Sequence, residues 1–184
     1  MTSTYEAPIV QEYLDLLDAQ REQTFTAIET LSHDKIWQRP APEEWCIGEI
    51  LNHNVLLFQS MFPLVKFTWR YFRWTGELLK SRQYRTTMAD PYRKAGFPHW
   101  VGFLWKPKYT PENSVTIDIL LAETRQTHRD VRRFYEGKEE ARLGHVYLFD
   151  PLFGFINLIL TLRVGIYHDQ LHYEDVIKIV KGGL

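Results

Sequence analysis

The sequence of 184 residues contains one cysteine and almost no net charge. Cys46 alone cannot form an internal disulfide, so we expect a reducing compartment, the cytoplasm. The formal net charge of −1 gives no protein-wide field that would attract nucleic acid or an anionic membrane. Residues 151–164 form the most apolar stretch, which is too short to span a membrane, and the N-terminus lacks the pattern of a secretory signal. We therefore expect neither a disulfide scaffold nor a membrane-spanning protein.

The sequence also lacks the motifs of several enzyme classes. It has no glycine-rich phosphate loop of a known pattern, and no spacing that assembles a Ser-His-Asp or Cys-His nucleophile. Cys46 precedes a predicted helix start, which can activate a thiol, but a small buried side chain is the favoured interpretation. No catalytic residue is assigned from the sequence.

Length, composition and periodicity instead indicate one globular helical domain over residues 1–184. Hydrophobic residues make up 45% of the chain and charged residues 24%, both ordinary values for a folded protein. Apolar residues recur at helical spacing over about 8–31 and 47–71, and Pro63 predicts a kink or break in the second helix.

Two further helices are predicted where a capping residue is followed by proline. Thr110 with Pro111 opens a helix that ends near Gly137, and Asp150 with Pro151 opens one that runs to about residue 180. None of the four segments shows convincing strand alternation.

The connection over residues 72–109 is much longer than the loops of up-and-down bundles. Such a connection can cross the bundle, so that its second and third helices run parallel. We therefore predict an all-α fold, a four-helix bundle with a long crossover connection between helices two and three.

The placement of histidine gives the main functional clue, because only three of the seven histidines are assigned to apolar faces of predicted helices. His53 shares its stripe with Ile50 and Leu57. His168 and His172 are separated by four residues, which stacks them on one face. All three rings are predicted to point into the bundle.

Three imidazoles in one core favour a metal ion over ordinary core histidines. Buried ring nitrogens without partners lose their hydrogen bonds to water, whereas one divalent cation satisfies a nitrogen from each ring. For the His168–His172 pair alone, bonds to carbonyls or carboxylates are the better explanation. With His53 added, the sequence predicts a metal site with an open position for water or a thiol.

The turn into the second helix reads LSHDKIWQRPAPEEWCIGEILNHN, and the fourth helix reads DPLFGFINLILTLRVGIYHDQLHYEDV. Both resemble the DinB-like superfamily of metal-dependent bundles, which includes bacterial thiol transferases. The resemblance covers most of the chain, and it carries the metal triad over to His53, His168 and His172. Asp150 departs from the family pattern, as do Glu174 and Asp175.

This resemblance implies a four-helix bundle, often dimeric, with one divalent metal ion. Nickel and zinc are preferred to manganese and iron. The resemblance also implies a small-molecule substrate. S-transfer from a low-molecular-weight thiol is the leading reaction, metal-dependent hydrolysis is the alternative, and a homodimer is the candidate assembly.

Residues near the triad have two interpretations each. The string HDQLH resembles the zinc-protease pattern HExxH, but aspartate is shorter than glutamate, and Asp169 is instead predicted to be a solvated charge. Asp175 is a candidate hydrogen-bond partner of a ligand ring, with a surface carboxylate as the alternative. Asn157 and Thr161 are candidates for a polar pocket wall, with capping and back-bonding slightly favoured.

Residues 66–108 carry ten Lys or Arg residues against Glu77 and Asp90, a net charge of about +8, interleaved with aromatics. Such a segment can stack bases, neutralise phosphates or lie on anionic lipid, which gives a nucleic-acid or membrane binding module as a second hypothesis. A packed lid over the mouth of the bundle is favoured, and nucleic acid is not an expected partner.

Overall fold

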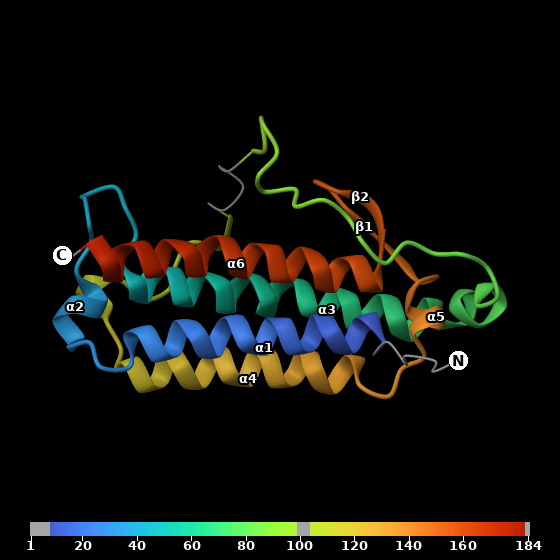
Figure 1. The fold of residues 1–184 in the computed structure, drawn as a ribbon, viewed down its shortest axis with the longest axis horizontal. Coiled ribbons are helices and arrows are strands. Elements are labelled where there is room, and N and C mark those ends of the chain that lie inside the picture. Colours follow the sequence, from blue (N-terminus) through green and yellow to red (C-terminus); the bar gives the residue numbers. More distant parts are fainter. Residues whose placement is uncertain (1–7, 99–103, 183–184) are drawn as a thin grey trace, which may run out of the picture.

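Four long helices form the frame of the computed structural model, which describes residues 8–98 and 104–182 (Figure 1). They are α1 (Ile9–Ile28), α3 (Ile47–Leu79), α4 (Ile117–Tyr135) and α6 (Leu158–Gly182). Two short helices, α2 (His33–Trp37) and α5 (Glu140–Leu143), lie in the connections. The predicted four-helix bundle is confirmed.

The helices run in two parallel pairs. Figure 1 shows α3 and α4 running in one direction and α1 and α6 in the other. Helix α3 packs against both α4 and α6, and α1 packs mainly against α6. Residues 80–116 join α3 to α4, and 99–103 within them lie outside the described residues. The bundle therefore places the N-terminal part of α3 beside the C-terminal half of α6.

Helix α3 is longer than predicted, since it ends at Leu79 instead of near residue 71, and it continues through Pro63 without a break. Proline removes one helical hydrogen bond and favours a break. Beyond it, however, the same helix face continues to be buried at Val65, Thr68 and Gly76. Tertiary packing of this stripe outweighs the local preference of Pro63.

The first cap-then-proline signal was misplaced. Pro111 opens a single 3-10 turn, Pro111–Asn113, and α4 begins only at Ile117, after Thr116. Its end at Tyr135 agrees with the predicted stop near Gly137, which has a φ of +72°.

The second signal, Asp150 with Pro151, was wrong about both the helix start and the absence of strands. Strands β1 (Tyr147–Asp150) and β2 (Gly154–Asn157) form an antiparallel hairpin, with Tyr147 opposite Asn157 and Leu148 opposite Ile156. The Asp150 carboxylate accepts hydrogen bonds from the backbone N–H groups of the turn, at 2.7 and 3.1 Å. Aspartate before proline therefore forms a turn here instead of a helix start, since the same pair of residues suits both.

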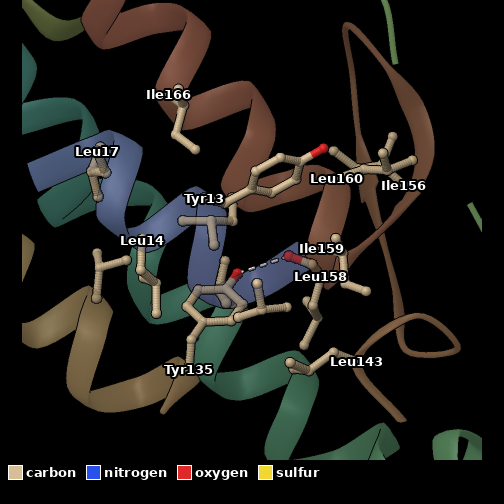
Figure 2. Close-up of a cluster of buried hydrophobic side chains, with 14 of the residues drawn as sticks. Tyr13, Leu14, Leu17, Tyr135, Leu143, Ile156, Leu158, Ile159, Leu160 and Ile166 are labelled. Carbon is tan, nitrogen blue, oxygen red and sulfur yellow. Dashed lines mark hydrogen bonds between the residues drawn. The ribbon is translucent and has the colours of Figure 1, made fainter. Parts of the chain in front are cut away.

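Two clusters of buried apolar side chains hold the bundle together. Figure 2 shows part of the first, where Leu14 and Leu17 of α1 lie close to Ile166 of α6. There the Tyr135 hydroxyl donates to the Leu158 carbonyl at 2.9 Å. The second cluster, at the other end, contains fully buried Cys46, and burial raises the pKa of its thiol to about 12. Among the described residues, no helix has the length and apolar character needed to cross a membrane.

Candidate metal centre

The three predicted histidines come together between α3 and α6. His53 is fully buried, His168 is buried and His172 is half-buried. One ring nitrogen from each lies within 4.8 Å of the other two. The ring centroids are 4.6 to 5.2 Å apart. Residues separated by 115 positions in the chain thus form one cluster.

The start of α3 fixes His53 in place. Glu49, in the first turn, accepts a hydrogen bond from the Cys46 N–H at 3.0 Å and satisfies one of the free donors at the helix end. Arg39 donates to both oxygens of the same carboxylate. His53 follows one turn later, so its position is set by a capped and ion-paired helix start.

A backbone carbonyl determines which nitrogen of His53 is available. The Nδ1 atom lies 2.7 Å from the Trp105 carbonyl oxygen, which can only accept, so Nδ1 carries the proton and Nε2 the lone pair. Burial is the main cause that lowers the pKa of His53 to about 4, and repulsion from a charged His168 ring is the second. The ring is therefore neutral near neutral pH, the form that binds metals.

The two Nε2 atoms of His53 and His168 fit a shared metal ion. They face each other at 3.3 Å. Two nitrogen ligands of a tetrahedral ion, each at about 2.0–2.1 Å from it, lie roughly 3.3–3.4 Å apart. His172 adds a third ring nitrogen within 4.8 Å of the other two. A donor set of three imidazoles suits a divalent cation.

Hydrogen bonds hold residues 104–109 of the connection after α3 next to the triad. The Asn52 side-chain oxygen accepts from the backbone N–H of Lys108 at 2.6 Å. Trp105 donates through its ring N–H to Ser60. Together with the bond from His53, these contacts hold residues 104–109 along α3. They support the lid interpretation for this part of the basic segment.

A pocket of about 480 Å³ opens beside the triad. Its walls are mostly apolar, although Asp150, Thr161 and Asp175 also line it. Helix α3 contributes Leu57, Phe58, Met61, Phe62 and Val65; the connection contributes Tyr92, Phe97 and Trp105; and the hairpin contributes Leu148, Leu152, Phe153 and Ile156. Burial raises the pKa of the Tyr92 hydroxyl, so this group stays protonated and can donate a hydrogen bond.

The prediction that Asp169 is a solvated charge was wrong. Asp169 is fully buried, and its Oδ2 accepts a hydrogen bond from His128 Nε2 at 3.0 Å. Burial pushes the pKa of Asp169 up, but the bond from His128 and the nearby His168 ring outweigh it, so the pKa lies below its ordinary value. Asp169 belongs to a buried stripe with Ile166 and Tyr173, at spacings of three and four.

The sorting of histidines also missed His128, which is 2% exposed on α4. A signal was present, since His128 lies four residues after Thr124 and three before Val131, both buried. His145 is buried too, and its ring lies 3.0 Å from the Arg82 carbonyl oxygen. Two buried histidines in the described residues therefore have partners outside the triad.

The other candidates near the triad have mainly structural roles. Asn157 caps α6 by accepting from the Leu160 N–H at 2.9 Å, and Thr161 donates back to the Asn157 carbonyl at 3.0 Å. Thr161 also lines the pocket. Asp175 lines the pocket as well, and its carboxylate accepts from Lys178 at 2.8 Å, so its role towards a ligand ring stays a prediction.

The basic segment, residues 66–108, divides into two parts. Aromatics from its later part line the pocket. Its earlier part is the end of α3, where Phe67 and Tyr71 are each 54% exposed and Trp74 is 57% exposed. The lid interpretation thus describes only the part of the segment after α3.

The sequence profile of the DinB superfamily matches residues 16–176. This match covers most of the chain and includes all three triad histidines. The chain belongs to the DinB superfamily. No curated protein matches the sequence significantly.

A solved structure supports the same fold. The chain is similar to YfiT from Bacillus subtilis, described as a probable metal-dependent hydrolase with an unusual four-helix bundle topology. The TM-score is 0.61 at 9% identity, over 99% of this chain and 91% of that chain. At this identity the likeness concerns the fold alone.

Proposed function

We propose that the protein is a divalent-metal-dependent enzyme whose centre consists of His53, His168 and His172. The observation that carries the proposal is the convergence of three ring nitrogens within 4.8 Å at the wall of an apolar pocket. A divalent ion held there supplies a Lewis acid with an open position, which favours deprotonation of a bound thiol or water. Nickel and zinc are the preferred ions, with manganese and iron next.

The surrounding residues orient the centre and cover part of it with aromatic rings. The Trp105 carbonyl holds the proton of His53 at Nδ1 and leaves Nε2 for coordination. The Trp45 ring covers His53, with 4.8 Å between ring centroids. Tyr92 packs against His168 at 5.6 Å between ring centroids. Apolar cover of this kind strengthens electrostatic interactions at the centre.

S-transfer from a low-molecular-weight thiol is the specific reaction that we propose. The apolar pocket suits the electrophilic acceptor, and a thiol cosubstrate agrees with the reducing cytoplasm predicted from the single cysteine. Hydrolysis is the second candidate, and the description of YfiT supports it. A homodimer stays a prediction, which light scattering of the purified protein tests.

The test combines metal analysis with turnover. We expect about one divalent ion per chain after saturation, and turnover with glutathione, bacillithiol or mycothiol and an electrophilic acceptor. Alanine at His53, His168 or His172 should remove metal and turnover together, whereas His33→Ala, an exposed control, should keep both. Hydrolysis of esters or amides without thiol transfer would select the second candidate. A saturated preparation that holds no ion would contradict both.

A further inference from the structure

The pocket is long as well as apolar. Along α3 its lining residues extend from His53 to Val65, and along the antiparallel α6 from Asp175 back to Thr161. At 1.5 Å per residue these stretches correspond to about 18–21 Å of helix axis. The triad lies at one end of this length, and the hairpin residues Leu148 and Ile156 lie against its other part.

The lining holds three histidine rings at the triad end, whereas its polar groups elsewhere are bonded to the backbone. The hydroxyls of Tyr135 and Thr161 donate to the Leu158 and Asn157 carbonyls, and Asp150 accepts from the N–H groups of its turn. The Tyr92 hydroxyl lies at the triad end, since Tyr92 packs on His168.

Farther along, the α3 wall is Leu57, Met61 and Val65, one turn apart, and these side chains offer no hydrogen-bond donor or acceptor of ordinary strength. A charged or strongly polar ligand group placed against this α3 wall would lose its hydration and gain no hydrogen bond from the wall.

We propose that the substrate has a linear apolar tail that lies along α3 towards the hairpin, with its reactive polar group at the triad. This inference rests on the proposed function for the head group only. The tail site itself is formed by apolar side chains and is independent of a bound ion. Small polar electrophiles would leave most of the pocket unfilled.

A homologous series of alkyl hydroxamic acids, from butyl to decyl, tests the tail site with a constant metal-binding head group. Binding to the zinc-loaded protein is measured by calorimetry and by quenching of tryptophan fluorescence. While the tail fits, each added methylene should strengthen binding by up to roughly four-fold, the gain expected for burying one such group.

Two matched variants of α3 show where the tail lies. Met61 lines the pocket and Leu64, three residues later, is 39% exposed and does not line it. In Met61→Trp, binding affinity should stop rising at a shorter tail than in the wild type. In Leu64→Trp, affinity should depend on tail length as it does in the wild type. Thr161→Phe narrows the pocket from the opposite wall and replaces Met61→Trp if that variant does not fold.

The outcomes separate the tail site from the metal chemistry. The tail site would be overturned if the affinity of the wild type did not depend on tail length. It would also be overturned if Met61→Trp or Thr161→Phe left that dependence unchanged. The same series on metal-free protein should bind more weakly but keep its dependence on length. If removing the metal changes nothing while the dependence on length persists, the tail site stands and the proposed metal function fails.

Discussion

Two clusters that contain buried histidines meet on neighbouring faces of α6: the triad, and His128 of α4 with Asp169. They differ in what their rings contact. His168 points to the pocket, where its Nε2 lies 3.3 Å from another imidazole nitrogen. The next residue, Asp169, points about 100° away and accepts a hydrogen bond from His128. The Asp169 carboxylate thus provides a hydrogen-bond partner for His128 within the protein core. The three triad nitrogens instead converge at the wall of a cavity. Burial of histidine alone therefore does not indicate a metal site.

Metal should stabilise one cluster and not the other, and this is the largest effect that we expect. Zinc or nickel at a hundredfold excess over its dissociation constant adds about 2.7 kcal/mol to the stability of the wild type. His172→Ala should lose this gain because a ligand is gone, and His128→Leu should keep it. Thermal unfolding with and without metal measures both. Equal gains in the two variants would remove the distinction between the clusters.

Without metal, His128→Leu should lose more unfolding free energy than His172→Ala, the reverse of their loss of metal stabilisation. His128→Leu leaves the buried Asp169 carboxylate without its donor, which costs about 1–3 kcal/mol of unfolding free energy. Half-buried His172→Ala should cost less. Replacing His128 and Asp169 together by leucine should recover part of the loss, since no unpaired group remains. Denaturant unfolding gives the values, and strictly additive losses would show that the pair is not coupled.

A second buried carboxylate sharpens the comparison, because Glu49 is paired with an arginine that stays charged. Burial raises the pKa of Glu49, but hydrogen bonds from Arg39 and Cys46 outweigh it and keep the pKa below its ordinary value. Its stabilising contribution is therefore present above about pH 4.5 and is lost as pH falls through the folded pKa. Glu49→Gln should cost about 1 kcal/mol at pH 7, discounted for the partly exposed Arg39.

The measurement is the unfolding free energy from pH 7 to pH 3. The difference between the wild type and Glu49→Gln should shrink towards acid pH. A difference that stays constant over this range would mean that the carboxylate does not titrate with folding.

The smallest expected effect concerns the basic residues at the end of α3 and just after it. At physiological salt we expect no appreciable binding of single-stranded oligonucleotide, although Arg70, Arg73, Arg82 and Arg85 give this region positive charge. Replacing the four arginines should consequently leave turnover and metal content unchanged. Sub-micromolar binding that weakens steeply with salt, with a slope reduced by these replacements, would restore the nucleic-acid hypothesis.

The bundle and the triad were predictable because both depend on helical spacing. His53, His168 and His172 occupy positions that periodicity alone places on inner faces. The hairpin was missed because Asp150 and Pro151 suit a helix start and a turn equally well, and four-residue strands are too short for a clear alternation. The predicted break at Pro63 did not occur, since long-range packing outweighed a local preference.

The details of the site were less accessible to sequence. The partner of His53 is the Trp105 carbonyl, a backbone group that any residue carries, so no residue type marks it. Asp169 was misjudged because its charge was given more weight than its spacing from Ile166 and Tyr173. That stripe places it inside, where His128 compensates for the lost water.

The bond from His53 to the Trp105 carbonyl has a consequence for the order of assembly. It joins residues 52 positions apart, and the contact from His53 to His168 joins residues 115 positions apart. Closing such loops costs entropy before any contact repays it. The helices can form from local preferences. The three histidines, however, reach their coordinating positions only after the connection that carries Trp105 has packed along α3 and α6 has docked. We therefore expect metal affinity to appear late in refolding, after helical content has reached its final value.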